Sequence, residues 1–245
     1  MKRFLLSATF LSAALTIMAQ NVTSPDGKMM LSFSIEKGRP TYVLTMDGKA
    51  IVAPSHLGYL LKKEKSDKST DFDWKPSRAT DKDADSKADF FSGFILLSFE
   101  NNSFDETWSP VWGEENSIRN HYKELLVKLK QSKNNRFMNI RFRLFNDGLG
   151  FRYEFPDQTN LTYFVVAEEL TEFAMTGDHT AWWVAGDYDT QEFNYQTTKL
   201  TGIRSQMKSA LSENSSTTPA GPTTVQTALQ MRTGDGVYLN IHEAA

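Results

Sequence analysis

Apolar and polar residues alternate along much of the chain, and this pattern predicts short β-strands. Leu31, Phe33 and Ile35 share one face of such a segment, while Ser32 and Ser34 take the other. A period of two residues is typical of a strand with one buried face. Further strands are predicted at residues 125–129, 163–166 and 237–241.

The clearest predicted element is a β-hairpin. Apolar residues alternate over 140–144, an Asn-Asp-Gly turn follows at 146–148, and the alternation resumes over 151–155. Asn and Asp before Gly favour the backbone of a tight turn between paired strands.

One segment departs from the period of two. Leu200, Ile203, Met207 and Leu211 are spaced by three and four residues, which predicts a short surface helix that ends before Asn214. Because the other signals are strands and polar turns, without an internal repeat, the predicted fold class is mainly β, as one large antiparallel β-sandwich.

Composition narrows the function classes. The chain has 245 residues, of which 40% are apolar and 12% aromatic, so it can bury a core. It has no cysteine, which excludes disulfides, a thiolate zinc site and a cysteine nucleophile. Any bound metal must therefore use oxygen or imidazole ligands.

The amino terminus is typical of a secretory signal peptide. Lys2 and Arg3 precede a mostly apolar stretch from Phe4 to Met18, and Ala19 is a small residue at the predicted cleavage site. Removal of residues 1–19 would change the formal net charge from −3 to −5, because two basic residues leave with them. We therefore expect an exported, periplasmic protein, with no membrane span after cleavage and no nucleic-acid partner.

Two polar segments are predicted to be loops, Ser66–Ala88 and Ser212–Thr224. The chain stops at Ala245, directly after a strand pattern. We therefore expect it to be part of a longer protein.

Two short motifs offer metal sites and are interpreted otherwise. Asp81, Asp83 and Asp85 alternate as in a calcium loop, but Gly and Glu are missing from the required later positions, so a solvated loop is predicted. His242 and Glu243 follow a strand rather than lying on a helix, which argues against a zinc-protease motif.

Aromatic and charged residues cluster in the middle of the chain. The tryptophans at 108, 112, 182 and 183 could stack on sugar rings, but packing in the core or at sheet edges is the favoured interpretation. An ion-pair network is likewise favoured for the polar residues that follow Trp112, namely Glu114, Glu115, Arg119 and His121.

The densest acidic segment spans residues 186–193, and its oxygen-rich side chains suit Ca²⁺. In a regular strand Asp187 and Asp189 would share a face and Glu192 would point to the other. From spacing alone, the two aspartates are the better candidates for ligands.

Four segments carry a resemblance to a known family: FDETWSPVWGEENSIRNHY (104–122), RFRLFNDGLGFRYEFP (141–156), GDYDTQEF (186–193) and VYLNIHEAA (237–245). They resemble glycoside hydrolase family 97, and most closely its starch-utilisation α-glucosidase. The resemblance covers essentially the whole chain after residue 19, in order.

The resemblance implies an enzyme of three parts: an amino-terminal β-super-sandwich of the galactose-mutarotase-like kind, a catalytic (β/α)₈ barrel and a carboxy-terminal β-domain. Residues 20–245 would be the first part only, with the barrel and the last domain absent from this chain. The catalytic carboxylates of the family lie in the barrel, so no catalytic residue is assigned here. Glu192 matches a glutamate that the family uses as a Ca²⁺ ligand, which would leave Asp187 and Asp189 to shape the loop.

The resemblance thus implies the amino-terminal domain of a calcium-dependent, exo-acting, inverting α-glucosidase that acts on maltooligosaccharides. This fragment would supply one ligand and part of the pocket wall to the barrel, and would be inactive alone. Two alternatives stay open: an α-galactosidase of the same family, and a stand-alone carbohydrate-binding module.

Overall fold

A computed structural model describes residues 19–62, 87–162, 164–187, 192–212 and 219–243. The chain divides into two compact units, Met1–Ala174 and Met175–Ala245, and the sequence pattern predicts no boundary between them. Residues 1–18 of the expected signal peptide and the aspartates at 81, 83 and 85 lie outside the described residues, as does most of the predicted loop 66–88. Among the described residues, no helix has the length and apolar composition needed to cross a bilayer.

The first unit contains a four-stranded antiparallel sheet near its amino terminus. Leu31 and Phe33 are fully buried on one face of the second strand, which confirms the predicted alternation. The strands lie in the order β1 (Gln20–Thr23), β2 (Met29–Glu36), β3 (Arg39–Met46) and β4 (Lys49–His56).

A second four-stranded sheet contains the predicted hairpin. Leu144 pairs with Leu149 across the turn, and the register continues to Asn139 opposite Glu154. The hairpin is therefore confirmed, together with the predicted strand at 125–129. The strands lie in the order β10 (Leu149–Glu154), β9 (Arg136–Leu144), β8 (Ile118–Gln131) and β7 (Phe94–Trp108).

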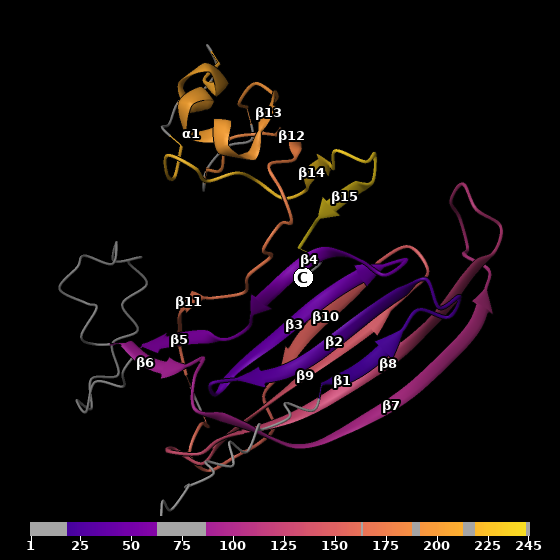
Figure 1. Ribbon diagram of the computed structural model, residues 1–245, viewed down its shortest axis with the longest axis vertical. Coiled ribbons are helices and arrows are strands. Elements are labelled where there is room, and N and C mark those ends of the chain that lie inside the picture. Colours follow the sequence, from indigo (N-terminus) through magenta and orange to yellow (C-terminus); the bar gives the residue numbers. More distant parts are fainter. Residues whose placement is uncertain (1–18, 63–86, 163, 188–191, 213–218, 244–245) are drawn as a thin grey trace, which may run out of the picture. The chain divides into compact units, whose positions relative to one another are not determined.

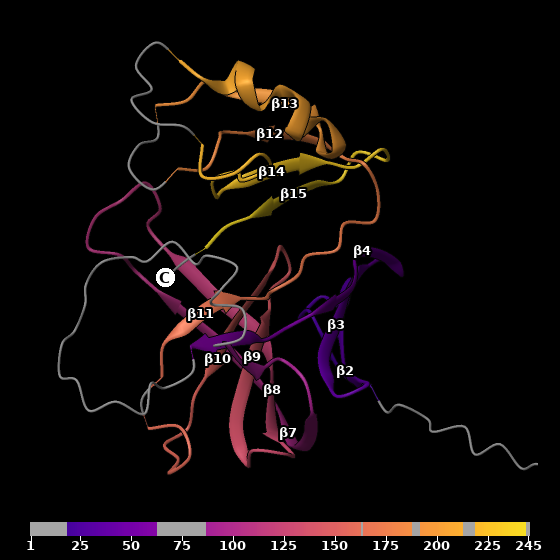
Figure 2. The same cartoon turned by 90° about the vertical axis from the view of Figure 1, so that its left-hand side faces the viewer.

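These two sheets face each other and enclose an aromatic core (Figures 1 and 2). The ring of Phe142, from β9, lies 5.9 Å from that of Phe33 and 6.4 Å from that of Tyr42, both in the opposite sheet. Phe151, from β10, completes the cluster at 5.9 Å from Tyr42. Burial of such rings is the main stabilising contribution to a sandwich of this kind.

A third, three-stranded sheet lies in the same unit. Its order is β11 (Val166–Glu169), β5 (Tyr59–Lys62) and β6 (Lys87–Phe90). Of the predicted strand at 163–166, only residue 166 lies in a strand, residues 164 and 165 do not, and residue 163 lies outside the described residues. Phe164 lies before the strand, where its ring packs 4.8 Å from that of Phe155.

Three turns of the first unit are joined by backbone hydrogen bonds. The amide of Phe94 donates to Gly38 O, and the amide of Ser132 donates to Gly93 O, both at 2.9 Å. A Cβ atom on Gly38 would lie 2.9 Å from Gly93 N, and Gly38 has φ of +81°. Only glycine satisfies both the positive φ and the close approach.

The second unit is a four-stranded antiparallel sheet with a short helical segment. Figure 2 shows its strands in the order β13 (Gln196–Lys199), β12 (Thr180–Trp183), β14 (Leu229–Arg232) and β15 (Tyr238–Ile241). The helical segment comprises η2 (Leu200–Gly202), α1 (Ile203–Gln206) and η3 (Met207–Ala210).

The predicted helix is confirmed in position, but it forms as three short turns rather than one continuous helix. Ile203 and Met207 are buried with Trp183 in the core of this unit, as their spacing predicted. Leu211 lies past the last turn and is 42% exposed, so the predicted helical pattern does not extend to it. The mainly β, antiparallel fold class is confirmed in both units.

Candidate functional site

Glu192 lies on a segment of the second unit whose backbone is firmly held. Its carbonyl accepts a hydrogen bond from the Ser212 hydroxyl, and the next residue, Phe193, is buried in the core. The amide of Asn194 then donates to Ala210 O at 2.8 Å. The side chain of Glu192 is exposed. A carboxylate therefore stands at the surface on an anchored backbone.

The preceding strand ends in a tightly packed turn. The amide of Gly186 donates to Thr224 O, and the amide of Ala220 donates to Gly186 O, both at 2.7 Å. A Cβ atom on Gly186 would lie 2.6 Å from Thr224 Cγ2, so a larger residue does not fit there. This packing fixes the start of the acidic segment at Asp187, whose side chain is half-buried. Asp189 lies outside the described residues.

The described side chains fit Ca²⁺ only in part. Carboxylate oxygen is the ligand that this ion prefers, and Glu192 offers it at the surface. Ca²⁺ takes about six to eight oxygen ligands, however. The described part of the chain contains no group of three His, Asp or Glu side chains that could hold a metal. Glu192 thus offers one suitable oxygen ligand, and the described residues do not by themselves form a complete site.

The tryptophans fall into two groups. Trp183 is fully buried and donates from Nε1 to Thr198 Oγ1 at 3.0 Å, and Trp182 stacks on Tyr238 with ring centroids 6.2 Å apart. The packing interpretation is confirmed for this pair. The packing interpretation is wrong for Trp112, which is 88% exposed. Trp108 is half-exposed and therefore packs only in part.

The polar residues after Trp112 include a confirmed ion pair. Arg119 donates from Nε and Nη2 to both carboxylate oxygens of Asp105, at 2.8 and 2.6 Å, and His121 Nε2 lies 3.9 Å from the same carboxylate. These hydrogen bonds from Arg119 lower the pKa of Asp105. Asp105 was not among the predicted members of this group, because its role depends on the pairing of β7 with β8.

A buried carboxylate was missed by the sequence analysis. Glu124 lies on β8, directly opposite Arg143 on β9, and its side chain is only 7% exposed. Its two oxygens accept hydrogen bonds from Arg141 Nη1 at 2.5 Å and from Arg143 Nε at 2.9 Å. Arg141 also pairs with Glu154 at 2.7 Å. No spacing in the sequence marks this network, because the register of β8 against β9 brings its residues together.

Burial alone would raise the pKa of Glu124, but hydrogen bonds from Arg143 and Arg141 and their charges outweigh it, so the pKa lies below its ordinary value. A carboxylate held ionised between two guanidinium groups is a poor proton donor. Glu124 is therefore a structural residue rather than a candidate general acid.

The Glu124→Gln variant is expected to lower the free energy of unfolding by about 3 kcal/mol at neutral pH, because Arg143 loses its buried partner and Arg141 keeps only Glu154. The folded-state pKa is depressed, so the stabilisation is present above the unfolded value near 4.5 and is lost as pH falls through the folded value. Urea denaturation between pH 7 and about pH 3 should show the difference from the parent shrinking.

The matched control is Glu100→Gln, which removes an ion pair to Lys128 in which both side chains are at least 40% exposed. Its cost should stay below about 1 kcal/mol. If the Glu124→Gln variant is no less stable than this control, the Glu124 network does not make the expected contribution to the free energy of unfolding.

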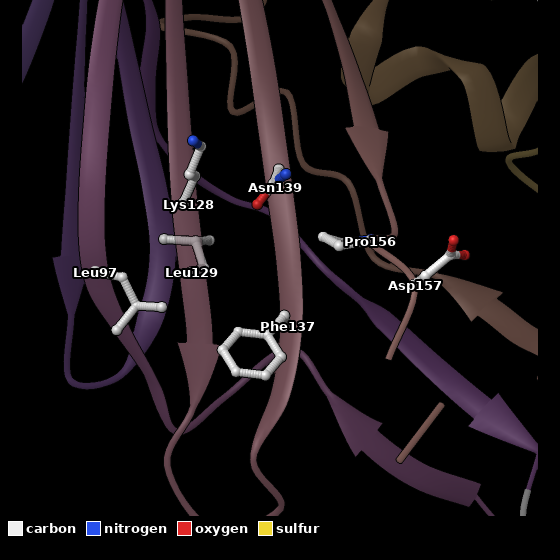
Figure 3. Close-up of a pocket in the computed structure, with 7 residues that line it drawn as sticks. All are labelled: Leu97, Lys128, Leu129, Phe137, Asn139, Pro156 and Asp157. Atoms are coloured by element: carbon white, nitrogen blue, oxygen red, sulfur yellow. The ribbon is translucent and has the colours of Figure 1, made fainter. Parts of the chain in front are cut away.

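A pocket of about 410 Å³ opens in the first unit (Figure 3). Its apolar lining comes from Leu97, Leu129, Phe137 and Pro156, and its polar lining from Lys128, Asn139 and Asp157. Figure 3 shows the Lys128 ammonium and the Asp157 carboxylate on opposite sides of the pocket, pointing away from each other. The pocket therefore contains no acid–base pair with facing side chains.

His242 and Glu243 are exposed after β15.

This chain is similar in sequence to proteins of a known family. The sequence matches the family described as Glycosyl-hydrolase 97 N-terminal over residues 22–245, across both units. A curated relative, the retaining alpha-galactosidase of Bacteroides thetaiotaomicron, is 26% identical over 215 residues, which are 83% of this chain and 28% of the relative.

Solved structures of the same family are similar in fold to this chain. A glycoside hydrolase family 97 enzyme from Pseudoalteromonas sp. strain K8, in complex with acarbose, matches 92% of this chain with a TM-score of 0.70 and 26% identity. A variant of a family 97 enzyme from the same strain, in complex with panose, matches with a TM-score of 0.69 and 26% identity. In each case this chain spans 28% of the solved chain. From residue 22 to residue 245, the chain belongs to the amino-terminal domain family of glycosyl hydrolase 97.

Proposed function

We propose that this chain is the amino-terminal domain of an exo-acting α-glucosidase that hydrolyses α-glucosidic bonds of maltooligosaccharides. The observation that carries this proposal is the likeness to the Pseudoalteromonas enzyme, whose solved complexes contain acarbose and panose. Both ligands are built from α-linked glucose or glucose-like rings. A substrate pocket in the rest of the polypeptide would recognise the same ring at the non-reducing end.

An α-galactosidase is the second candidate. It is favoured by the curated relative from Bacteroides thetaiotaomicron, which is a retaining alpha-galactosidase and shares the same 26% identity with this chain. Glucose and galactose differ only in the orientation of one hydroxyl group. The residues that distinguish them would lie in the pocket itself, so the fold of this domain favours neither.

Hydrolysis of a glycosidic bond uses two carboxyl groups. One protonates the leaving oxygen, and the other activates water in inverting enzymes or attacks the sugar in retaining ones. We assign neither role to this chain and propose that both groups lie in the catalytic domain that follows it. The inverting outcome is proposed for the α-glucosidase and the retaining one for the alternative.

The contribution proposed for this chain is Glu192. Its exposed carboxylate on an anchored backbone supports a role as one Ca²⁺ ligand, with the other ligands supplied by the catalytic domain. A bound Ca²⁺ ion would polarise substrate oxygens as a Lewis acid. The hydrogen bond from Ser212 to Glu192 O holds the backbone of this residue in place.

The intact protein should hydrolyse 4-nitrophenyl α-glucoside at least about 100-fold faster, by kcat/KM, than 4-nitrophenyl α-galactoside, because a pocket built to hydrogen-bond one hydroxyl rejects its epimer. The anomer released first, followed by NMR, separates inversion from retention. The reverse ratio would favour the second candidate.

Residues 20–245 alone are expected to hydrolyse neither substrate. Turnover by this fragment would contradict the proposal that the reacting carboxylates lie elsewhere. Tight binding of maltooligosaccharides by the fragment, measured by calorimetry, would favour a carbohydrate-binding module instead.

Export to the periplasm is proposed from the charged and apolar pattern of residues 1–19. Protein recovered from the periplasm should begin at Gln20. Recovery of the protein only from the cytoplasm, with Met1 retained, would contradict export.

A further inference from the structure

The hairpin formed by β7 and β8 extends beyond the sheet to which it belongs. β9 pairs with β8 from Gln131 only as far as Lys123. β7 and β8 continue as a pair from Phe104 opposite Tyr122 to Trp108 opposite Ile118. No third strand accompanies this part among the described residues. Figure 1 shows the turn of this hairpin projecting past the neighbouring strands of the first unit. We call residues 104–122 the ribbon.

The two faces of the ribbon differ in character. Phe104, Trp108 and Ile118 lie on one face, each between 38% and 48% exposed, with Glu106 and Asn120 between them. The other face carries polar residues, among them the Arg119–Asp105 ion pair. A two-stranded ribbon is marginally stable in water unless its apolar face is covered. This amphipathic pattern therefore indicates a surface that packs against further polypeptide.

The tip of the ribbon is also apolar. Val111 is 99% exposed and Trp112 is 88% exposed, in the turn between the two strands. At the base of the ribbon, Tyr122 stacks on Phe104 with ring centroids 5.3 Å apart, and Arg143 lies 4.5 Å above the ring of Tyr122. The base is thus rigidly packed against the sheet, and the exposed apolar side chains are concentrated at the far end.

We propose that the apolar face and tip of the ribbon form the surface on which the catalytic domain of the same polypeptide docks. This inference rests on the proposed function, in which a catalytic domain follows this chain. The chain spans only 28% of the solved relatives, so most of a polypeptide of that length lies outside it. Exposed tryptophan flanked by aliphatic side chains is characteristic of the centre of a protein interface.

Charge argues against a second copy as the occupant. The ribbon carries four acidic residues and one arginine, a net charge of −3. Two ribbons facing each other would bring like charges together at a surface that excludes water. A catalytic-domain surface with basic groups around an apolar centre matches the ribbon instead.

A glucan is also a poorer match. Sugar rings stack on flat aromatic faces, and Val111, the most exposed apolar side chain of the ribbon, offers none. One face of the Phe104 ring is covered by Tyr122. The mixture of aliphatic and aromatic side chains fits burial against protein better than stacking on sugar.

Photo-cross-linking in the intact protein tests this docking surface. The photoreactive residue p-benzoylphenylalanine is placed at Trp112, and in a matched control at Thr107, an exposed residue of the opposite face of the same ribbon. We expect position 112 to cross-link within the polypeptide to residues beyond 245, with at least ten-fold higher yield than position 107, roughly the difference between a contacting and a solvent-facing side chain.

Three results would overturn the proposal: covalent dimers from position 112, cross-links confined to residues 20–245, or equal yields from positions 112 and 107. Cross-linking requires no substrate, so it is independent of the glycosidase assay. If the intact polypeptide cross-links as expected but hydrolyses neither nitrophenyl glycoside, the docking surface stands and the proposed substrate fails. If it is an active glycosidase without the cross-link, only the docking surface fails.

Discussion

Replacement of Phe142 by alanine is expected to lower the free energy of unfolding by about 4 kcal/mol, the largest stability effect predicted for this chain. Phe142 is fully buried and contacts rings from both sheets of the first unit, at 5.9 Å from Phe33 and 5.8 Å from Phe151. Its removal would leave a cavity that neither sheet can fill without a shift of its backbone. Urea denaturation followed by tryptophan fluorescence measures the change.

Phe99→Ala is the matched control, because Phe99 lies on β7 in the same sheet but is 45% exposed. It should cost less than about half as much, since less apolar area is removed from contact. Equal costs for the two variants would show that the aromatic cluster around Phe142 is not the main source of stability in this unit.

Glu192→Gln in the intact protein is expected to weaken Ca²⁺ binding by roughly 100-fold or more, because a ligand loses its charge while its shape is kept. Activity should fall together with affinity if the ion polarises the substrate. Isothermal calorimetry with Ca²⁺ gives the affinity without any turnover, and the nitrophenyl glycoside assay gives the activity.

The control is Glu243→Gln, which removes another exposed carboxylate of the second unit. It should leave both readouts within about two-fold of the parent, as expected for a surface substitution away from a site. Unchanged calcium affinity in Glu192→Gln would exclude Glu192 as a ligand, whatever happens to the activity.

The local elements were predictable because their signals are local. The alternation over 140–155 and the turn at 146–148 specify the hairpin within sixteen consecutive residues, and β9 and β10 form as expected. The three-stranded sheet was not predictable, because β5 pairs with β11 through Leu61 and Val166, far apart in sequence. Strand propensity does not determine which distant segment becomes the partner.

The candidate site shows the same division. Spacing alone favoured Asp187 and Asp189, and only the family resemblance pointed to Glu192, because a metal site assembled from separate domains leaves no ligand spacing within one of them. The buried Glu124 depends on the register of β8 against β9. Trp112 was expected to pack, but it lies in a turn beyond the sheet, where this chain has no surface to cover it in the described residues.

The joined turns at Gly38, Gly93 and Ser132 bear on how this domain tolerates insertions. Loop tips usually accept added residues, fusion partners or natural length variation. Here a longer loop at Gly38 or Gly93 would break a hydrogen bond to the neighbouring turn and force the two backbones apart. Length variation among natural sequences of this domain should therefore concentrate at other turns, and an affinity tag inserted at this end of the sandwich would be poorly accommodated.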